Sequence, residues 1–364
     1  MFTVITCSII ALLLTYLESH GQMKNGMKFG FFLIAFLGAI HYDYGNDYMA
    51  YLESAISYTN QSFNLSEILS GDEFVDFGWV LLCWFFKPFG GFFVMVAVLN
   101  VVQNIIVYKF IKNNVDLKWR PLAVFVYLFT TNLYLLTFSM MRQMFVMMMF
   151  LGMWKYISHR NWLIPFAVLF LCTFIHGSSI ILLPFAFWGF VPMRNSKYVG
   201  LGYVVVFVVL WIFKDALNVI TRLSLTMNDI FAGYAETYGG YDNSFRLGLG
   251  FVINMIPFIL SILYLMKNNN SSQAKSLVAL SAVPFLITPF SQVVSLVSRV
   301  GFYFNVFSIA SLPCIYSNIN NYIRRSVLLA LYILITLYDY YIFFTNSIYS
   351  ESYSIFHNIF SQIF

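Results

Sequence analysis

Residues 91–111 read GFFVMVAVLNVVQNIIVYKFI, a stretch whose only charged residue is Lys109, near its end. A helix needs about 20 mainly apolar residues to cross a hydrocarbon core of roughly 30 Å, and this stretch has that length. Comparable apolar stretches recur along the chain at about 2–17, 28–41, 120–137, 140–157, 162–176, 178–192, 198–213, 247–266, 276–290, 300–317 and 326–345. The pattern predicts an all-α, polytopic integral membrane protein, because the strands of a membrane barrel are about ten residues long and alternate in polarity.

The overall composition agrees with helices in a membrane. The 364 residues are 60% hydrophobic and 10% charged, whereas soluble domains carry roughly 25% charged residues, so there is too little polar material to cover a water-soluble fold. The net charge of +5 has no run of like charges behind it, which argues against nucleic-acid binding. The four cysteines form no CxxC pair and no metal-ligand motif is present, so we expect no disulfide framework, metal or cofactor.

The few charges predict how the chain is oriented. Cytoplasmic loops attract Lys and Arg, and the apolar run 74–86 is too short to cross comfortably. If this run lies on the outer surface as a juxtamembrane helix, the acids inside are only Glu18 and Asp116. The basic residues outside are then only Lys87, Arg142, Lys214, Arg222, Arg246 and Arg299.

This separation of charge is much cleaner than the one obtained if 74–86 crosses the membrane. It predicts about twelve spans, within a range of 10–13, with both termini outside and one transmembrane domain over 1–364. Residues 2–17 would be a retained first span, because no basic n-region precedes them. Two long loops, about 42–90 and 214–246, would lie outside, and loops of this length usually carry function or are disordered.

The first candidate group follows the second apolar stretch and reads HYDYGNDYMAY from His41 to Tyr51. Asp43 and Asp47 are four residues apart, so on a helix they would share a face. A carboxylate at the edge of an apolar surface can take a proton from a hydroxyl. The alternative is an ordinary acidic loop in which one of these carboxylates caps the next helix.

Isolated arginines form the second group. Arg142 begins an otherwise apolar stretch within SMMRQM (139–144), and Arg299 has a similar setting within SLVSRVGFYF (295–304). A guanidinium is a planar fork of donors that suits phosphate oxygens, so these two arginines, together with Arg246, could clamp a diphosphate. The alternative is snorkelling from a helix end, and for Arg246 we prefer it.

A histidine stands between two apolar stretches, in FIHGSS (174–179). At a helix break, His176 can serve as a base or donate a hydrogen bond to an oxyanion. The alternative is a structural histidine whose hydrogen bonds are satisfied within the fold. His176 lies at the outer end of its predicted span, as Asp47 and Arg142 do, so we expect the chemistry at the outer face.

These short motifs, in this order, resemble the EpsG family of bacterial membrane proteins, which includes Wzy-type polymerases of O-antigen and capsular polysaccharides. The resemblance covers roughly residues 30–317, and the chain departs from the family's pattern at His41-Tyr42, where an arginine or a small residue is more typical. The acidic first outer loop also resembles that of GT-C polyprenyl-phosphate glycosyltransferases. The matching motifs are Gly45-Asn-Asp47-Tyr48 with Tyr51, Asp76-Phe-Gly-Trp79, Met141-Arg142-Gln143, Ile175-His176-Gly-Ser-Ser179, and Arg299 with Tyr303-Phe304.

The resemblance implies a glycan polymerase, a metal-independent glycosyltransferase, at the periplasmic or extracellular face of the bacterial inner membrane. Its substrate would be an undecaprenyl-diphosphate-linked oligosaccharide, and its partners would be membrane lipid and a chain-length regulator protein. In this hypothesis the base is Asp47 or His176, and the catalytic cations are Arg142 and Arg299. The expected substrate-binding residues are Asp43, Tyr48, Tyr51, Gln143, Arg246 and Tyr303, with tyrosines of 228–243 stacking on sugars.

Three other functions stay open on the sequence. A transporter or flippase would need a polar path and broken helices in paired halves, but Asp339 is nearly alone as a charge inside an apolar stretch. A membrane O-acyltransferase would need an acyl donor, commonly from the cytoplasm, whereas the candidate residues are predicted outside. A purely structural subunit would leave the isolated outer arginines unexplained.

Overall fold

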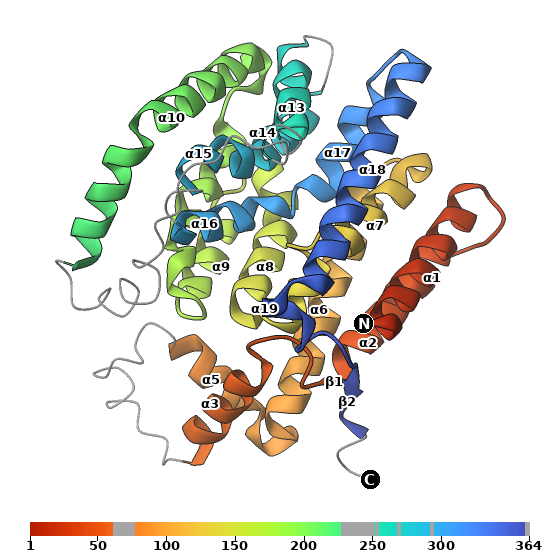
Figure 1. Ribbon diagram of the computed structural model, residues 1–364, viewed down its shortest axis with the longest axis vertical. Helices are drawn as coiled ribbons and strands as arrows, with labels where there is room; N and C mark the ends of the chain where they lie inside the picture. The colour runs from red at the N-terminus through yellow and green to blue at the C-terminus, as the bar shows by residue number, and fades with distance from the viewer. Residues whose placement is uncertain (61–76, 227–250, 252–254, 268–270, 292–294, 361–364) are drawn as a thin grey trace. The chain divides into compact units, whose positions relative to one another are not determined.

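The computed structural model describes residues 1–60, 77–226, 251, 255–267, 271–291 and 295–360, which are almost entirely helical (Figure 1). They divide into two compact units, one formed by Met1–Phe190 with Tyr316–Phe364 and the other by Val191–Ile315. Among the described residues, 5 helices are long and apolar enough to cross a membrane, or 6 if a bent pair is one span. The predicted polytopic helical class is confirmed, whereas the twelve spans and the surface position of 74–86 stay predictions.

The described residues of the first unit are mainly helical, and short turns join α1 to α2 and α6 to α7. Helix α2 packs against both α1 and α6, and α8 packs against both α6 and α9. Helices suit these apolar segments because every backbone hydrogen bond is then made within the segment. The elements are α1 (Phe2–Ser19), α2 (Gly26–Ile40), β1 (His41–Tyr42), α3 (Tyr48–Asn60), α5 (Phe77–Phe86), η2 (Lys87–Phe89), α6 (Gly91–Asn114), η3 (Leu117–Trp119), α7 (Arg120–Phe129), η4 (Tyr134–Phe138), α8 (Met141–Ser158), α9 (Leu163–Thr173), η5 (Gly177–Phe190), α18 (Tyr322–Thr345), α19 (Ser347–Ser350) and β2 (His357–Asn358).

Glycines bring α1 and α2 together. A Cβ atom at Gly26 would lie 2.0 Å from the carbonyl oxygen of Leu14, and one at Gly30 would lie 2.9 Å from that of Ala11. Both distances are shorter than a real Cβ contact, so only glycine permits this approach of the two backbones. Small residues at helix–helix contacts are a common feature of membrane proteins, because lipid supplies little drive for larger side chains to associate.

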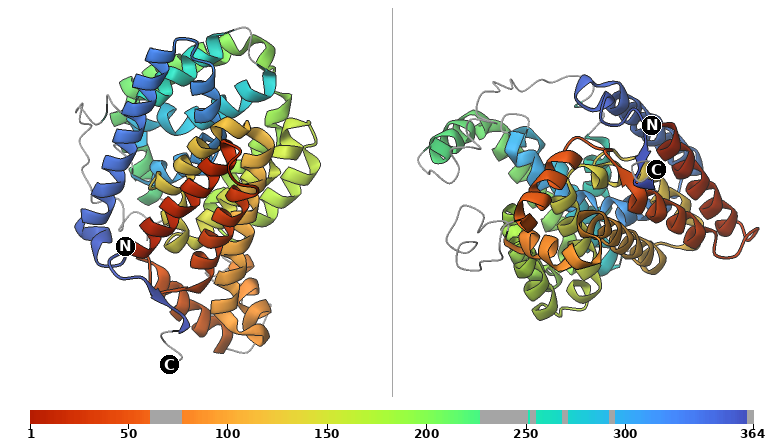
Figure 2. Two further views of the ribbon diagram at one scale, coloured as in Figure 1. Left: turned by 90° about the vertical axis from the view of Figure 1, so that its right-hand side faces the viewer. Right: turned by 90° about the horizontal axis from the view of Figure 1, so that it is seen from below.

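The first and last parts of this unit meet at one end, which the left view of Figure 2 shows around the N-terminus. The amino group of Met1 donates a hydrogen bond to the carbonyl oxygen of Ser354 at 2.8 Å. Strand β1 pairs antiparallel with β2, with His41 opposite Asn358 and Tyr42 opposite His357. This end of the unit also carries the candidate active site.

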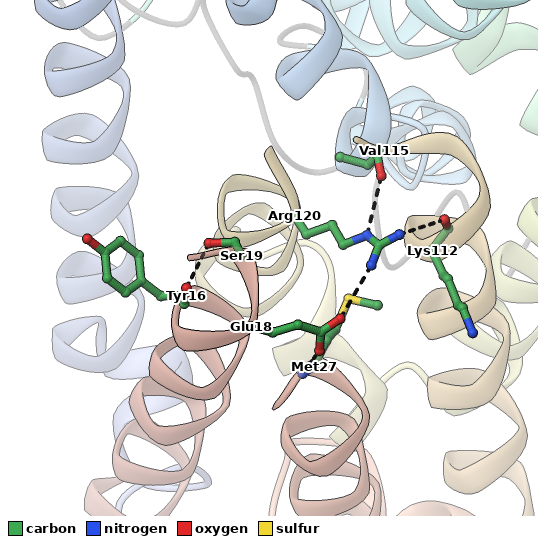
Figure 3. Close-up of polar contacts among 7 residues, drawn as sticks. All are labelled: Tyr16, Glu18, Ser19, Met27, Lys112, Val115 and Arg120. Atoms are coloured by element: carbon green, nitrogen blue, oxygen red, sulfur yellow. Dashed lines mark hydrogen bonds and ion pairs between the residues drawn. The ribbon is translucent and has the colours of Figure 1, made fainter. Parts of the chain in front are cut away.

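A group of polar contacts closes the opposite end of α1 and α2 (Figure 3). The Oε2 atom of Glu18 accepts a hydrogen bond from the backbone N–H of Met27 at 2.7 Å, and its Oε1 lies 3.4 Å from Nη1 of Arg120. The same guanidinium donates to the carbonyl oxygens of Lys112 at 3.1 Å and Val115 at 3.4 Å. The turn after α1 and the turn after α6 therefore lie together, as expected for two turns predicted on one side of the membrane.

The prediction of one continuous apolar helix over 120–137 is wrong. Helix α7 ends at Phe129, and the chain turns through Thr130–Asn132 before it continues as the 3₁₀-helix η4. The polar residues of the turn interrupt the apolar sequence, and the Tyr134 hydroxyl donates to the carbonyl oxygen of Ile34 at 2.9 Å. Non-helical backbone at membrane depth is tolerated where protein surrounds it, and η4 is entirely buried.

The predicted stretch 178–192 also differs from an α-helix, since Gly177–Phe190 forms the 3₁₀-helix η5 with Pro184 inside it. Proline removes a backbone donor and disfavours the α-helical hydrogen-bond pattern. The 3₁₀ form is normally used in short pieces, so a run of 14 residues is unusual. Helix α9 packs directly against it.

The second unit is smaller and also helical. The Tyr203 hydroxyl donates to the carbonyl oxygen of Ala279 at 3.0 Å, and the Ser196 hydroxyl donates to that of Leu265 at 2.6 Å. The predicted continuous stretch 300–317 is in fact broken, because its two helices are bent by 62°. The elements are η6 (Met193–Asn195), α10 (Ser196–Thr226), α13 (Ile256–Met266), α14 (Ser272–Leu286), α15 (Thr288–Ser291), α16 (Ser295–Asn305) and α17 (Ser308–Ser317), whose last two residues belong to the first unit.

Candidate active site

A tight turn after β1 presents Asp47. Gly45 has φ +112°, and a Cβ atom there would lie 2.4 Å from the carbonyl oxygen of Phe138, so no other residue fits this turn without a shift. Helix α3 begins at Tyr48, immediately after Asp47. Asp43 has φ 44° and lies before the turn. Asp43 and Asp47 therefore do not share a helical face, because the helix starts only after both of them.

The Asp47 carboxylate is exposed and receives a hydrogen bond from the buried Ser139 hydroxyl, whose Oγ lies 3.2 Å from Oδ2. Ser139 follows η4 and stands three residues before Arg142. The two candidate motifs are therefore in direct contact, although 92 positions separate Asp47 from Ser139. The contact comes from the break after α7, which turns the chain back toward α3.

Tyr51 connects Asp47 with Arg142. The guanidinium carbon of Arg142 lies 5.3 Å from the centroid of the Tyr51 ring, within the range of a cation–π interaction. Burial raises the pKa of Tyr51, while the charge of Arg142 and its hydrogen bond to the phenol act in the opposite direction, and the charge of Asp47 adds to the rise. Asp47, Tyr51 and Arg142 therefore act on one another electrostatically. Arg142 is half-buried at the first turn of α8.

An apolar core supports these residues from one side, and we call it the aromatic cluster. Its residues come from α3, α5, α6 and the start of α8, and the half-buried Tyr51 and Ile175 pack against it. Such a core holds the polar groups at its edge in one geometry, since its side chains are close-packed. The cluster comprises Tyr48, Leu52, Ala55, Trp79, Cys83, Phe92, Met95, Val96, Leu99 and Met141.

The segment before His176 is attached to the same cluster. The backbone N–H of Gly78, in α5, donates to the carbonyl oxygen of Phe174 at 2.7 Å. Ile175 packs against the aromatic cluster, and His176 is half-buried one residue further on. His176 and Arg142 therefore lie next to residues of one apolar core, since Met141 is a member of it. This pairing of α5 with the segment before His176 could not be predicted from the sequence, because neither contains a charged partner for the other.

The other predicted residues of the first unit are less accessible. Tyr48 is fully buried and donates a hydrogen bond to the carbonyl oxygen of His41 at 3.3 Å. Gln143 is 2% exposed. Both lie in the packed surroundings of the site, and their roles as substrate-binding residues stay predictions.

Arg299 and Tyr303 belong to α16 in the second unit. Arg299 is half-buried, and Tyr303 is fully buried. The pairing of Arg142 with Arg299 around one diphosphate stays a prediction. Arg246, Asp76 and the tyrosines of 228–243 lie outside the described residues.

Two parts of the site could not be predicted from the sequence. Ser139 stands inside a quoted motif, but a lone serine carries no signal for a carboxylate 92 positions away. The second part is the segment 346–358, which contains no apolar stretch and no motif. In the described part of the chain, no group of three or more His, Cys, Asp or Glu side chains is arranged to hold a metal ion.

The fold and this site define a multi-pass helical membrane protein with an acid, an arginine and a histidine at one end of its first unit. The chain belongs to the EpsG family, whose family model matches residues 26–357. The resemblance noted from the motifs is therefore confirmed, and it extends past both ends of 30–317. No curated protein and no solved structure matches the chain. Membership in this family is consistent with a membrane polysaccharide polymerase.

Proposed function

We propose that this protein is a glycosyltransferase that polymerises a surface polysaccharide at the outer face of the bacterial inner membrane. Its substrate would be an undecaprenyl-diphosphate-linked glycan, moved onto a sugar hydroxyl of the next lipid-linked repeat. The observation that carries the proposal is the contact between an acid motif and an arginine motif, through Ser139 and Asp47 at 3.2 Å and Tyr51 and Arg142 at 5.3 Å.

The reaction needs two kinds of group, and the site has both. The acceptor hydroxyl must lose its proton as it attacks the anomeric carbon, and the exposed Asp47 carboxylate is suited to accept that proton. The bond from the anomeric carbon to the diphosphate oxygen breaks at the same time, and negative charge develops on the leaving diphosphate. A guanidinium held in advance where this charge develops lowers the barrier, and this is the role we assign to Arg142.

His176 is the alternative base. It is half-buried beside the aromatic cluster, and a neutral imidazole could accept the same proton. Its substitution is therefore compared with that of Asp47 below. Arg299 is the second proposed cation, by analogy of its setting in sequence with that of Arg142.

The lipid part of the substrate suits the surface of the first unit. Helices α1, α2 and α9 carry large apolar side chains that are more than a third exposed, which is expected of surfaces that contact lipid. Examples are Leu13, Phe29, Phe32, Phe36, Leu163, Phe170 and Leu171. A polyprenyl chain can occupy such a surface while its diphosphate stays at the membrane edge.

Deletion of the gene, with analysis of surface glycan length, tests the proposal. A polymerase predicts single capped repeats in place of long chains, restored by the wild-type gene supplied in trans. Unchanged glycan length would contradict the proposal. Loss of all surface repeats, with lipid-linked units retained in the cytoplasmic leaflet, would favour a flippase. Loss of an acyl group at unchanged length would favour an acyltransferase.

A further inference from the structure

The chain does not end at the last long helix. After α18 it turns through α19 and returns as β2, which pairs with β1 beside the turn that carries Asp47 (Figure 1). We call residues 346–358 the C-terminal segment. Its contacts with the start of the chain join parts of the sequence about 300 positions apart.

Two hydrogen bonds fasten this segment to the residues just before Asp47. The backbone N–H of Gly45 donates to the carbonyl oxygen of Ser352 at 3.1 Å. The Asn46 side chain donates from Nδ2 to the carbonyl oxygen of Ile348, also at 3.1 Å. Asp47 is the next residue, so the segment limits the positions that its backbone can take.

Tyr353 anchors the segment in the protein. Its side chain is fully buried, with its ring centroid 5.0 Å from that of Tyr44, and its hydroxyl donates to the carbonyl oxygen of Leu135 at 3.1 Å. Leu135 belongs to η4, and the backbone N–H of Ser139 donates to the carbonyl oxygen of the next residue, Leu136, at 3.2 Å, so this hydrogen bond connects Tyr353 to the element that leads into Ser139. Tyr353 therefore holds the 3₁₀-helix η4 that ends just before Ser139, whose hydroxyl donates a hydrogen bond to the Asp47 carboxylate.

We propose that Tyr353 is a positioning residue for Asp47, acting through η4 and the Ser139 that follows it, and through the turn that the C-terminal segment holds. The inference rests on the proposed function, in which Asp47 accepts the proton of the acceptor hydroxyl. Asp47 is exposed and precedes the first residue of a helix, and the hydrogen bond from Ser139 holds its carboxylate. A displacement of about 1 Å at a reacting group can cost roughly a hundredfold in rate.

The test uses the full-length protein in nanodiscs, with lipid-linked repeat units isolated from a strain that lacks the gene. Tyr353→Phe keeps the ring and removes only the hydroxyl, so the fold should survive. We expect kcat to fall about tenfold, as for the loss of one hydrogen bond that aligns a reacting group, with KM unchanged. The melting temperature should fall by only a few degrees, because the carbonyl oxygen of Leu135 loses its donor. Tyr338→Phe is the matched control, because it removes a hydroxyl from an exposed tyrosine of α18, and it should behave as wild type.

A double-mutant cycle separates positioning from packing. If Tyr353 acts through Ser139, the double variant with Ser139→Ala and Tyr353→Phe should be no slower than Ser139→Ala alone, within about twofold. Ser139→Thr, which keeps a hydroxyl, should recover part of the lost rate. Wild-type kcat in Tyr353→Phe, a loss that follows unfolding, or additive losses in the cycle would each overturn the inference. Wild-type protein that elongates nothing would instead sink the proposed function, and this inference with it.

Discussion

Arg142 combines a charge, a half-buried position and a specific neighbour, since its guanidinium carbon lies 5.3 Å from the centroid of the Tyr51 ring. A diphosphate would be bound by its planar fork of donors, which an ammonium group cannot reproduce. We therefore expect Arg142→Lys to lower polymerisation by about tenfold or more, because charge-assisted bidentate hydrogen bonds are lost. Glycan chain length in the complemented deletion strain measures this. Arg324→Lys, an exposed arginine at the start of α18, is the control, and full activity of Arg142→Lys would contradict bidentate binding.

Asp47 and His176 compete for the role of the base. If Asp47 takes the proton, Asp47→Asn should lower the rate by about a hundredfold or more, while its amide oxygen can still accept the hydrogen bond from Ser139. Asp43→Asn should cost far less, because Asp43 lies before the turn. Rates measured on isolated lipid-linked repeats decide between the two candidates. A severe loss in His176→Gln with near-normal Asp47→Asn would move the role of the base to His176.

The burial of His41 predicts that the stability of the fold depends on pH. Burial lowers its pKa to about 4, and the hydrogen bond between Nδ1 and the carbonyl oxygen of Gly38 at 2.6 Å opposes this only in part. Between pH 6.5 and 4 the unfolded chain binds a proton at His41 that the folded chain does not. Stability should therefore fall as the pH drops through this window, by about 3 kcal/mol at most.

Thermal unfolding of the detergent-purified protein at pH 7 and pH 5 measures this effect. His41→Asn has no group that titrates in this window and should lose less stability over the same interval than the wild type. An equal loss in both proteins would show that other groups dominate the acid sensitivity. The ring of His41 packs against those of Tyr48 and Phe138, so the two proteins should be compared by their change with pH and not by absolute stability.

At the scale of elements, two turns at the end opposite the site depend on one carboxylate. Glu18 accepts a hydrogen bond at the start of α2 and faces Arg120 from the start of α7. Glu18→Gln weakens both contacts, and the side chains are only partly exposed. We expect the melting temperature to fall by roughly 1–2 °C, the effect of about 1 kcal/mol in a chain of this size. Activity of the folded protein should be unchanged, because the substitution lies away from Asp47, and lost activity at full stability would refute this separation of roles.

The break after α7 explains how Ser139 comes to lie beside Asp47. Had α7 continued without interruption through 120–137, Ser139 would have followed a straight helix. Instead the helix ends at Phe129, and the buried η4 brings Ser139 to Asp47. The polar triplet Thr130–Asn132 is the feature of the sequence behind the break, but its effect depends on buried partners such as the carbonyl oxygen of Ile34, which accepts from Tyr134.

At the scale of the whole molecule, the arrangement of the first unit predicts which turns lie on the same side of the membrane. The turns before α2 and after α6 meet through Glu18 and Arg120, so both must lie on one side of the membrane. Reporter fusions at residues 25 and 115 should therefore give the same location, which we expect to be cytoplasmic from the basic residues there. A fusion at residue 60 should report the opposite side. Residue 60 on the cytoplasmic side would overturn the proposed outer-face site.

The sequence by itself determined the class of protein and its family. Hydropathy is a sum over neighbouring residues, so apolar stretches indicate membrane helices even when the packing of these helices is unknown. The order of short motifs was likewise enough to indicate the EpsG family, whose model matches residues 26–357. The local sequence also revealed Asp47, Arg142 and His176 as candidates, because charged or titratable groups at the ends of apolar stretches are costly without a role.

Only the tertiary structure decided how these residues meet. Ser139 reaches Asp47 across 92 positions, and Asn46 reaches Ile348 across 302. Which helices break, and which distant segments then touch, depends on the fit of side chains between elements and on buried backbone groups that need partners. Neither the fit of side chains nor the pairing of buried backbone groups can be read from a local stretch of sequence. The membrane class therefore followed from composition and pattern, whereas the contacts around Asp47 arise only when the two ends of the chain pack together.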